Sequence, residues 1–132
     1  MGTLLAATTI TTAVTNQLST AVIMQDVKYM AVQGSITYGS GGTNAKMWLQ
    51  TSIDEGTSWI DIAEFTFTTS TAKRVYSLDG VAVTTIYTPT DAAITANTSK
   101  SGIFGDRFRV KYTTTGTYSG STSIRLDATV AK

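Results

Sequence analysis

The chain has 132 residues, of which 42% are hydrophobic, so it is long enough and apolar enough to form one domain with a packed core. It contains no cysteine and no histidine, which excludes disulfides and removes the commonest general base and transition-metal ligand. Only 14% of the residues are charged, compared with about 25% in typical domains. Threonine is abundant instead, and because it is β-branched it predicts an all-β fold.

The net charge of +1 is unevenly divided along the chain. Residues 1–70 carry two basic and five acidic side chains, whereas residues 71–132 carry eight basic and four acidic ones. Such an asymmetry occurs in proteins that bind nucleic acid, but it also helps copies of one chain to pack side by side. Because the basic residues are spread along the chain, we favour the second interpretation and expect no nucleic-acid partner.

No apolar run approaches the roughly 18 residues that a membrane-spanning helix needs. The N-terminus also lacks the basic-then-apolar order of a signal peptide. We therefore expect no membrane partner, and we expect synthesis and first assembly in the cytoplasm.

Residues 1–21 form an uncharged, threonine-rich segment ahead of a single domain that we assign to residues 22–132. Its β-branched residues oppose a helix, and a free tail of this composition would be prone to aggregate. The segment is therefore either an edge strand of the domain or an arm that becomes ordered on a neighbouring subunit. In the second case the contacts would be made by Thr3, Leu4, Leu5 and Ile10.

A β-hairpin is predicted over Ala45–Thr69, after one long strand or two short ones in Ala21–Tyr38 and a turn at Gly39–Asn44. Two apolar-rich runs flank its tip, where we expect Asp54 to accept backbone hydrogen bonds and Gly56 to take a positive φ. The spacing of the tip resembles the Asp-box of sialidases and related β-proteins, where the box is a folding device away from the catalytic centre. Its residues here are Ser52, Asp54, Gly56, Ser58 and Trp59.

The rest of the chain also predicts strands. Lys73–Leu78 and Val81–Tyr87 precede a long loop at Thr88–Gly102, which includes a short strand near Ala93–Ala96. In Gly105–Tyr112 and Ser123–Val130 apolar and polar residues alternate strictly, and we interpret these two strands as a hairpin with one solvated face. About eight to nine evenly spaced strands are typical of a β-sandwich, jelly roll or small barrel. We predict an antiparallel β-sandwich of the jelly-roll type.

Acidic residues offer two candidate sites. Asp61 and Glu64 form a carboxylate pair of the kind that glycoside hydrolysis needs, but strand alternation places them on opposite faces. Asp54, Glu55 and Asp61 supply oxygens suited to Ca²⁺, but their spacing is not that of an EF-hand, and the Asp-box explains Asp54 without a metal. We expect no catalytic residue, no metal and no cofactor.

The third candidate is a basic stripe on the polar face of the Gly105–Tyr112 strand, formed by Arg107, Arg109 and Lys111. Arg125 would join this stripe if the register of the next strand allows. The aromatic residues Phe108 and Tyr112 alternate onto the other face, which disfavours stacking on single-stranded nucleic acid. The stripe is either a solvated sheet face or, as we favour, a surface for an acidic protein partner.

The two tryptophans have different expected places. Trp59 follows the turn and is expected in the core beneath it. Trp48 points to the face of its strand opposite that of Met47 and Leu49, and is therefore the candidate surface or interface aromatic.

Two segments, Trp48–Ala63 and Gly105–Tyr118, resemble small virion proteins of tailed bacteriophages, and the nearest type is the jelly-roll capsid cement (decoration) protein. The resemblance implies a structural protein on the virion surface that stabilises the head by bridging subunits of the major capsid protein. It also implies a homo-oligomer, a dimer or trimer, and brings no catalytic residues. The alternative is a carbohydrate-binding β-sandwich module or a phage tail component that recognises glycans, most plausibly through Trp48 and Gln50. An enzyme is not expected.

Overall fold

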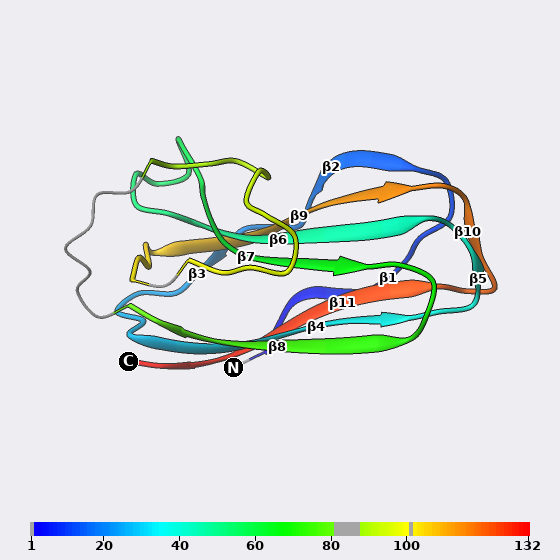
Figure 1. Cartoon of the computed structure of the whole chain (residues 1–132). Helices are drawn as coiled ribbons and strands as arrows, with labels where there is room; N and C mark the ends of the chain where they lie inside the picture. Colours follow the sequence, from blue (N-terminus) through cyan, green and yellow to red (C-terminus); the bar gives the residue numbers. More distant parts are fainter. Residues whose placement is uncertain (1, 81–87, 101) are drawn as a thin grey trace.

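The computed structural model describes residues 2–80, 88–100 and 102–132 as two antiparallel β-sheets packed face to face (Figure 1). The strand predicted at Val81–Tyr87 lies outside the described residues. The strands are, in chain order, β1 (Gly2–Thr9), β2 (Val14–Leu18), β3 (Val22–Ile23), β4 (Tyr29–Thr37), β5 (Ser40–Gly41), β6 (Asn44–Ser52), β7 (Ile60–Phe67), β8 (Ala72–Asp79), β9 (Arg107–Thr115), β10 (Tyr118–Ser119) and β11 (Ser123–Ala131).

The two sheets differ in their strand order. Sheet I has the order β1-β11-β4-β8, and sheet II has the order β2-β9-β6-β7, with β3 also paired to β9. The short strands β5 and β10 form a separate ribbon at one end of the sandwich (Figure 1). Among the described residues no helix is long and apolar enough to cross a membrane.

This strand order is that of a jelly roll. Strands β2 and β3 both pair with β9 and count as one strand, and the ribbon of β5 and β10 lies outside the two sheets. Numbered from one to eight, the remaining strands are then arranged 1-8-3-6 in sheet I and 2-7-4-5 in sheet II. Two four-stranded sheets with this interleaved order form the double Greek key of the jelly roll, so the predicted all-β sandwich is confirmed.

The core lies between the sheets and follows the alternation of the strands. Phe108 and Val110 of β9 and Ile124 and Leu126 of β11 are fully buried, while the residues between them face outward. The predicted inward direction of Phe65 in β7 is confirmed as well. Burial of apolar surface of this kind is the main force that holds the two sheets together, at about 25 cal/mol per Å².

Strands β9 and β11 do not form the predicted hairpin. β9 pairs with β2, β3 and β6 in sheet II, and β11 pairs with β1 and β4 in sheet I. The chain between them crosses from one sheet to the other through β10, as the orange and red segments of Figure 1 show. The alternation of a strand indicates that one face is buried, but not which strand lies beside it. The short strand expected near Ala93–Ala96 is also wrong, because this part of the loop contains bends and turns.

The N-terminal segment is an edge strand of the same chain, not an arm. β1 pairs with β11, and Leu4, Leu5 and Ile10 are only 5%, 8% and 4% exposed in the core of their own domain. Consecutive Leu4 and Leu5 both point inward because the register of β1 shifts between Thr3 and Leu5. The apolar surface that suggested an arm is therefore covered by the chain's own sheets, and of the predicted contact residues only Thr3 is exposed.

Candidate functional site

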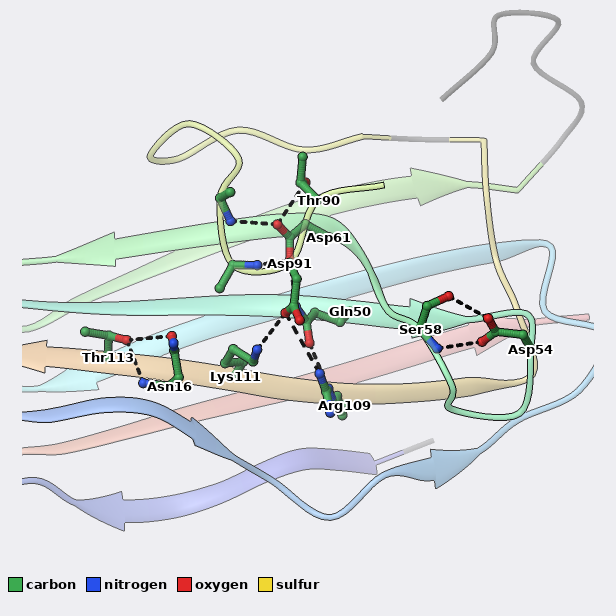
Figure 2. A network of polar contacts seen from close by, with 12 residues as sticks. Asn16, Gln50, Asp54, Ser58, Asp61, Thr90, Asp91, Arg109, Lys111 and Thr113 are labelled. Atoms are coloured by element: carbon green, nitrogen blue, oxygen red, sulfur yellow. Dashed lines mark hydrogen bonds and ion pairs between the residues drawn. The ribbon is translucent and has the colours of Figure 1, made fainter. Parts of the chain in front are cut away.

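The Asp-box turn joins β6 to β7 and is held by its own polar side chains (Figure 2). The carboxylate of Asp54 accepts hydrogen bonds from the Ser58 N–H at 2.9 Å, the Ser58 hydroxyl at 2.6 Å and the Ser52 hydroxyl at 2.8 Å. The Gly56 N–H donates to Ser52 Oγ at 2.9 Å, and Gly56 has the expected positive φ of 87°. This turn is a folding device, because its acidic group is occupied by its own loop.

These hydrogen bonds predict how the stability of the protein depends on pH. Hydrogen bonds from Ser58, and then from Ser52, lower the pKa of Asp54 from 3.8 to about 2. A carboxylate with a lowered pKa stabilises the fold above its ordinary pKa and loses that contribution as the pH falls through the lowered value. The advantage of the parent over Asp54→Asn, measured as the difference in urea midpoint, should therefore be full at pH 5 and shrink between about pH 4 and pH 2.

Glu55→Gln is the matched control, because Glu55 lies in the same exposed turn and its carboxylate has no hydrogen bond in the described part of the chain. Its urea midpoint should follow that of the parent across the same pH range. A difference between the parent and Asp54→Asn that does not change between pH 5 and pH 2 would show that the carboxylate does not hold the turn.

A β-bulge at Ile62 changes the direction of the residues that follow the turn. In the pairing of β6 with β7, Trp48 lies opposite Glu64, whereas Gln50 lies opposite Asp61, so Ile62 is the extra residue. Because Trp48 and Gln50 are two residues apart on β6, they share the outer face of sheet II, and so do the residues opposite them. The prediction that Asp61 and Glu64 lie on opposite faces is therefore wrong.

The two carboxylates are nevertheless not arranged for catalysis, because loop 88–100 covers them. Asp61 accepts hydrogen bonds from the N–H groups of Ala92 and Ala93, both at 2.8 Å, and from the Thr90 hydroxyl at 3.0 Å. Gln50 Nε2 donates a fourth bond to Asp61 at 2.8 Å. Asp61 is fully buried, so its oxygens are already used to hold the loop and are not available to a sugar or a water molecule.

Glu64 holds the other half of the same loop. It accepts a hydrogen bond from the Asn97 N–H at 2.8 Å and bonds from the Thr66 hydroxyl to both of its oxygens. Burial raises the pKa of Glu64 above 4.5 and outweighs the lowering by these hydrogen bonds and by the charge of Lys46. Glu64 is therefore a structural carboxylate, like Asp61.

The basic stripe is neutralised from within the chain. Lys111 Nζ donates to Asp91 Oδ1 of loop 88–100 at 2.6 Å, and the Arg109 guanidinium lies 3.9 Å from the same oxygen (Figure 2). Gln50 joins these groups, since it donates to Asp91 at 2.6 Å and accepts from Arg109 Nε at 2.8 Å. These five residues, which we call the polar cluster, are Gln50, Asp61, Asp91, Arg109 and Lys111.

The charges of the polar cluster compensate each other. Partial burial raises the pKa of Asp91, but hydrogen bonds from Lys111 and Gln50 and the charges of Lys111 and Arg109 lower it below 3.8 in total. Two basic and two acidic side chains therefore face one another under the loop. A paired cluster of this kind has little charge left for an acidic partner, so the structure does not support that interpretation of Arg109 and Lys111.

The other two basic candidates lie apart from this cluster. Arg125 is on β11 in sheet I, where it bonds to Asp127 at 2.9 Å, because β9 and β11 belong to different sheets. Arg107 lies at the Asp-box end of β9, next to Asp106, and its side chain is about one-third exposed. The four basic residues therefore do not form one continuous surface.

Neither tryptophan has the exposure that the sequence predicted. Trp48 is only 7% exposed, on the outer face of sheet II, and its Nε1 has no hydrogen-bond partner among the described residues. Trp59 is half-buried outside the hydrophobic core, with the Arg109 guanidinium 4.1 Å from its ring centroid. The sequence could not show this, because the bulge and the covering loop decide which side chain is left partly exposed.

The outer face of sheet I is exposed, whereas loop 88–100 covers the β7 side of sheet II. Its uncharged side chains include Ala31, Gln33, Thr129 and Val75, which is 64% exposed, and its charged ones include Lys73, Arg125 and Asp127. A shallow depression of about 290 Å³ lies at its centre, lined by Gln33, Val75, Asp127 and Thr129 among others. Sequence analysis did not identify this face, because none of its residues belongs to a motif.

The side chains of the polar cluster are bonded to one another within the chain. Among residues 2–80, 88–100 and 102–132, no group of three or more acidic side chains is placed to hold a metal ion. Comparisons with protein-family models, with curated proteins and with solved structures found no match to this chain. The function is therefore inferred from the resemblance of two segments and from the exposed face of sheet I.

Proposed function

We propose that this protein is a structural virion protein, a capsid cement (decoration) protein of a tailed bacteriophage. It binds the outer surface of the head, after assembly in the host cytoplasm, and stabilises the head by bridging subunits of the major capsid protein. The role is not catalytic and involves no cofactor. The proposal rests on the resemblance of two segments to such virion proteins and on one observation, the exposed face of sheet I.

The face of sheet I supports this proposal because it is suited to broad contact with another protein. Its middle carries the short side chains of Ala31, Ser77 and Thr129, and Arg125 is already joined to Asp127 at 2.9 Å. Covering such a face leaves few charged groups without water or a partner, so the desolvation cost of an interface is kept low. Each contact needs only modest strength, because repetition over a symmetric shell raises the effective concentration of the others.

Binding to shells tests the proposal. Purified phage heads that lack decoration should bind the protein in co-sedimentation and lose their DNA or unfold at a higher temperature when it is bound. Ala31→Glu places a charge on the exposed face of sheet I and should weaken binding at least about tenfold, which corresponds to about 1.4 kcal/mol.

Ala96→Glu is the matched control, because it makes the same substitution at an exposed position of loop 88–100, over the other sheet. It should bind shells as the parent does. No binding of the parent to shells would contradict the function itself. Equal binding by Ala31→Glu would place the contact on another surface.

Sugar recognition is the second candidate, but the residues that it requires are covered. A glycan-binding module or tail component needs an exposed aromatic platform, and Trp48 and Gln50 are 7% and 0% exposed. One side of the ring of Trp59 is occupied by Arg109. We therefore expect no binding on a glycan array.

A further inference from the structure

The four edges of the two sheets are protected to different extents. An unprotected edge strand exposes a row of backbone N–H and C=O groups to which another strand can pair. The pairing of β1 contains two register shifts, and β2 is interrupted by a shift at Asn16, which has a φ of 52°. Both strands therefore have the irregular geometry that discourages pairing with another chain.

The edge of β7 is covered by loop 88–100. The Asp61 N–H donates to Thr90 O at 3.0 Å, the Glu64 N–H donates to Thr98 O at 2.9 Å, and the Lys100 N–H donates to Ile62 O at 2.9 Å. The backbone groups that β7 directs outward are thus satisfied within the chain. The buried carboxylates of Asp61 and Glu64 hold this loop against β7 by accepting hydrogen bonds from its N–H groups.

Strand β8 is the exception among the described strands. Its pairing with β4 runs from Ala72 to Asp79 without a register shift, and β4 is its only partner in a sheet. Figure 1 shows it at the border of sheet I, away from loop 88–100. β8 is therefore a regular edge strand of eight residues.

Two hydrogen bonds at the end of β8 show which of its backbone groups face outward. The Gly80 N–H donates to Lys28 O on the β4 side at 2.7 Å, whereas Asp79 O accepts from the Gly102 N–H on the other side at 2.5 Å. Since successive residues of a strand direct their backbone groups to opposite sides, Lys73, Val75 and Ser77 face outward together with Asp79. In the described part of the chain, the outward backbone groups of Lys73, Val75 and Ser77 have no hydrogen-bond partner, whereas Asp79 has one.

We propose that β8 is an interaction surface that pairs with β8 of a second copy of this chain. The pairing is antiparallel, with Val75 opposite Val75 of the second copy, because Val75 is the middle one of the three residues whose outward backbone groups have no partner. Lys73 then lies opposite Ser77, and the three residue pairs each exchange two backbone hydrogen bonds. The proposal does not depend on the function proposed above.

Side chains support the antiparallel self-pairing. The side chains of Lys73, Val75 and Ser77 lie on the exposed face of sheet I. In the dimer the two Val75 side chains, each 64% exposed in the monomer, therefore meet side by side. Lys73 is near the basic end of β8 and lies diagonally across from the acidic Asp79 of the second copy, within the reach of a long side chain. A parallel pairing would instead place Lys73 beside Lys73, which is unfavourable.

The dimer would join the two copies of sheet I into one continuous sheet of eight strands. Its exposed face would be twice as large as that of one chain, with the two depressions related by a two-fold axis. If the face of sheet I binds a shell, pairing would therefore present two linked binding faces.

The test is the concentration dependence of the mass of the purified chain. Sedimentation velocity from about 1 μM to about 1 mM should show a reversible monomer–dimer equilibrium. Val75→Pro removes an outward N–H without removing a bond to β4, so it should fold and dimerise at least about tenfold more weakly. Val75→Thr is the control, since it keeps the N–H and the β-branched shape, and it should dimerise within about threefold of the parent.

Amide hydrogen exchange gives a second measurement that does not need a variant. In dilute protein the amides of Val75 and Ser77 should exchange quickly, whereas those of Tyr76 and Leu78, which face β4, should be protected. Raising the concentration should protect Val75 and Ser77. A chain that stays monomeric to about 1 mM, or a dimer in which these two amides stay unprotected, would overturn the proposal. Protection of the two amides only after shells are added would assign the β8 edge to another protein.

Discussion

Asp61→Ala is expected to destabilise the protein by about 3–5 kcal/mol, because it removes a fully buried carboxylate that accepts four hydrogen bonds. Four hydrogen bonds end on this carboxylate, from the amide of Gln50, the hydroxyl of Thr90 and two N–H groups of loop 88–100. The Gln50 amide is fully buried and cannot turn to water, and the bonds from Thr90, Ala92 and Ala93 are partly buried beneath the loop. Urea denaturation should show the loss as a lower midpoint.

Asp91→Ala is the control for this variant, because Asp91 belongs to the same polar cluster but its side chain is 52% exposed. Its carboxylate is open to water, but the Arg109 and Lys111 side chains with which it pairs are only 13% and 12% exposed, so we expect a loss of about 1–2 kcal/mol, smaller than for Asp61→Ala. Hydrogen exchange should also separate the two variants. In Asp61→Ala the amides of Glu64 and Lys100, which join β7 to the loop, should lose protection, whereas Asp91→Ala should leave them protected. Equal midpoints for the two variants would contradict the role assigned to Asp61.

Much of the fold could be predicted because the strands alternate so regularly. In β9 and β11 apolar residues at every second position are buried, among them Phe108, Val110, Ile124 and Leu126. Glycine-containing turns mark both ends of β9 and the start of β11. The Asp-box turn was equally readable, since its hydrogen bonds join residues at most four apart. Local patterns of this kind are a property of one strand or one turn, and they need no knowledge of the neighbours.

The arrangement of the strands could not be predicted in the same way. β9 lies beside β6, which precedes it by more than fifty residues, and the jelly roll consists largely of such distant pairs. Nothing in the alternation of Gly105–Tyr112 distinguishes this partner from the next strand in the chain. The interpretation as a hairpin used the shortest connection, whereas the chain changes sheets between β9 and β11.

The polar cluster was missed for two physical reasons. The bulge at Ile62 shifts one residue out of the alternation, so the face assigned to Asp61 was wrong. Loop 88–100 has no periodic pattern, and only the structure shows that it lies on β7 and supplies Asp91. An acidic residue in a polar loop, with basic residues on the outer face of a strand, was the available signal, but it did not indicate which residues would meet.

Gly105→Ala is expected to have the second large effect, a destabilisation of about 3 kcal/mol or more. Gly105 lies just before β9, next to Ser52, the last residue of β6. A Cβ atom at this position would lie 1.8 Å from Ser52 O and 2.3 Å from Ser52 C. Both atoms belong to the backbone, so no side chain can turn aside to make room.

The strain would act on contacts that join the end of β6 to the start of β9. Ser52 O accepts a hydrogen bond from the Asp106 N–H at 3.1 Å, and the Gly105 N–H donates to Thr51 Oγ1 at 2.8 Å. Moving the backbone by the distance that a methyl group needs would break both bonds, and Thr51 is fully buried. The Asp-box turn, which begins at Ser52, would lose its fixed position on the sheet.

Gly2→Ala is the matched control, since a Cβ atom at Gly2 would meet nothing within 4 Å, and its urea midpoint should correspond to a change within about 0.5 kcal/mol. Gly105 is not among the glycines with a positive φ, so alanine can adopt its backbone conformation. A loss of stability in Gly105→Ala, but not in Gly2→Ala, would therefore come from the contact of the new Cβ atom with Ser52. Gly105→Ala with the stability of the parent would mean that β6 and β9 can separate at this end without loss. The close approach of Ser52 to Gly105 would then not contribute to the stability of the sandwich.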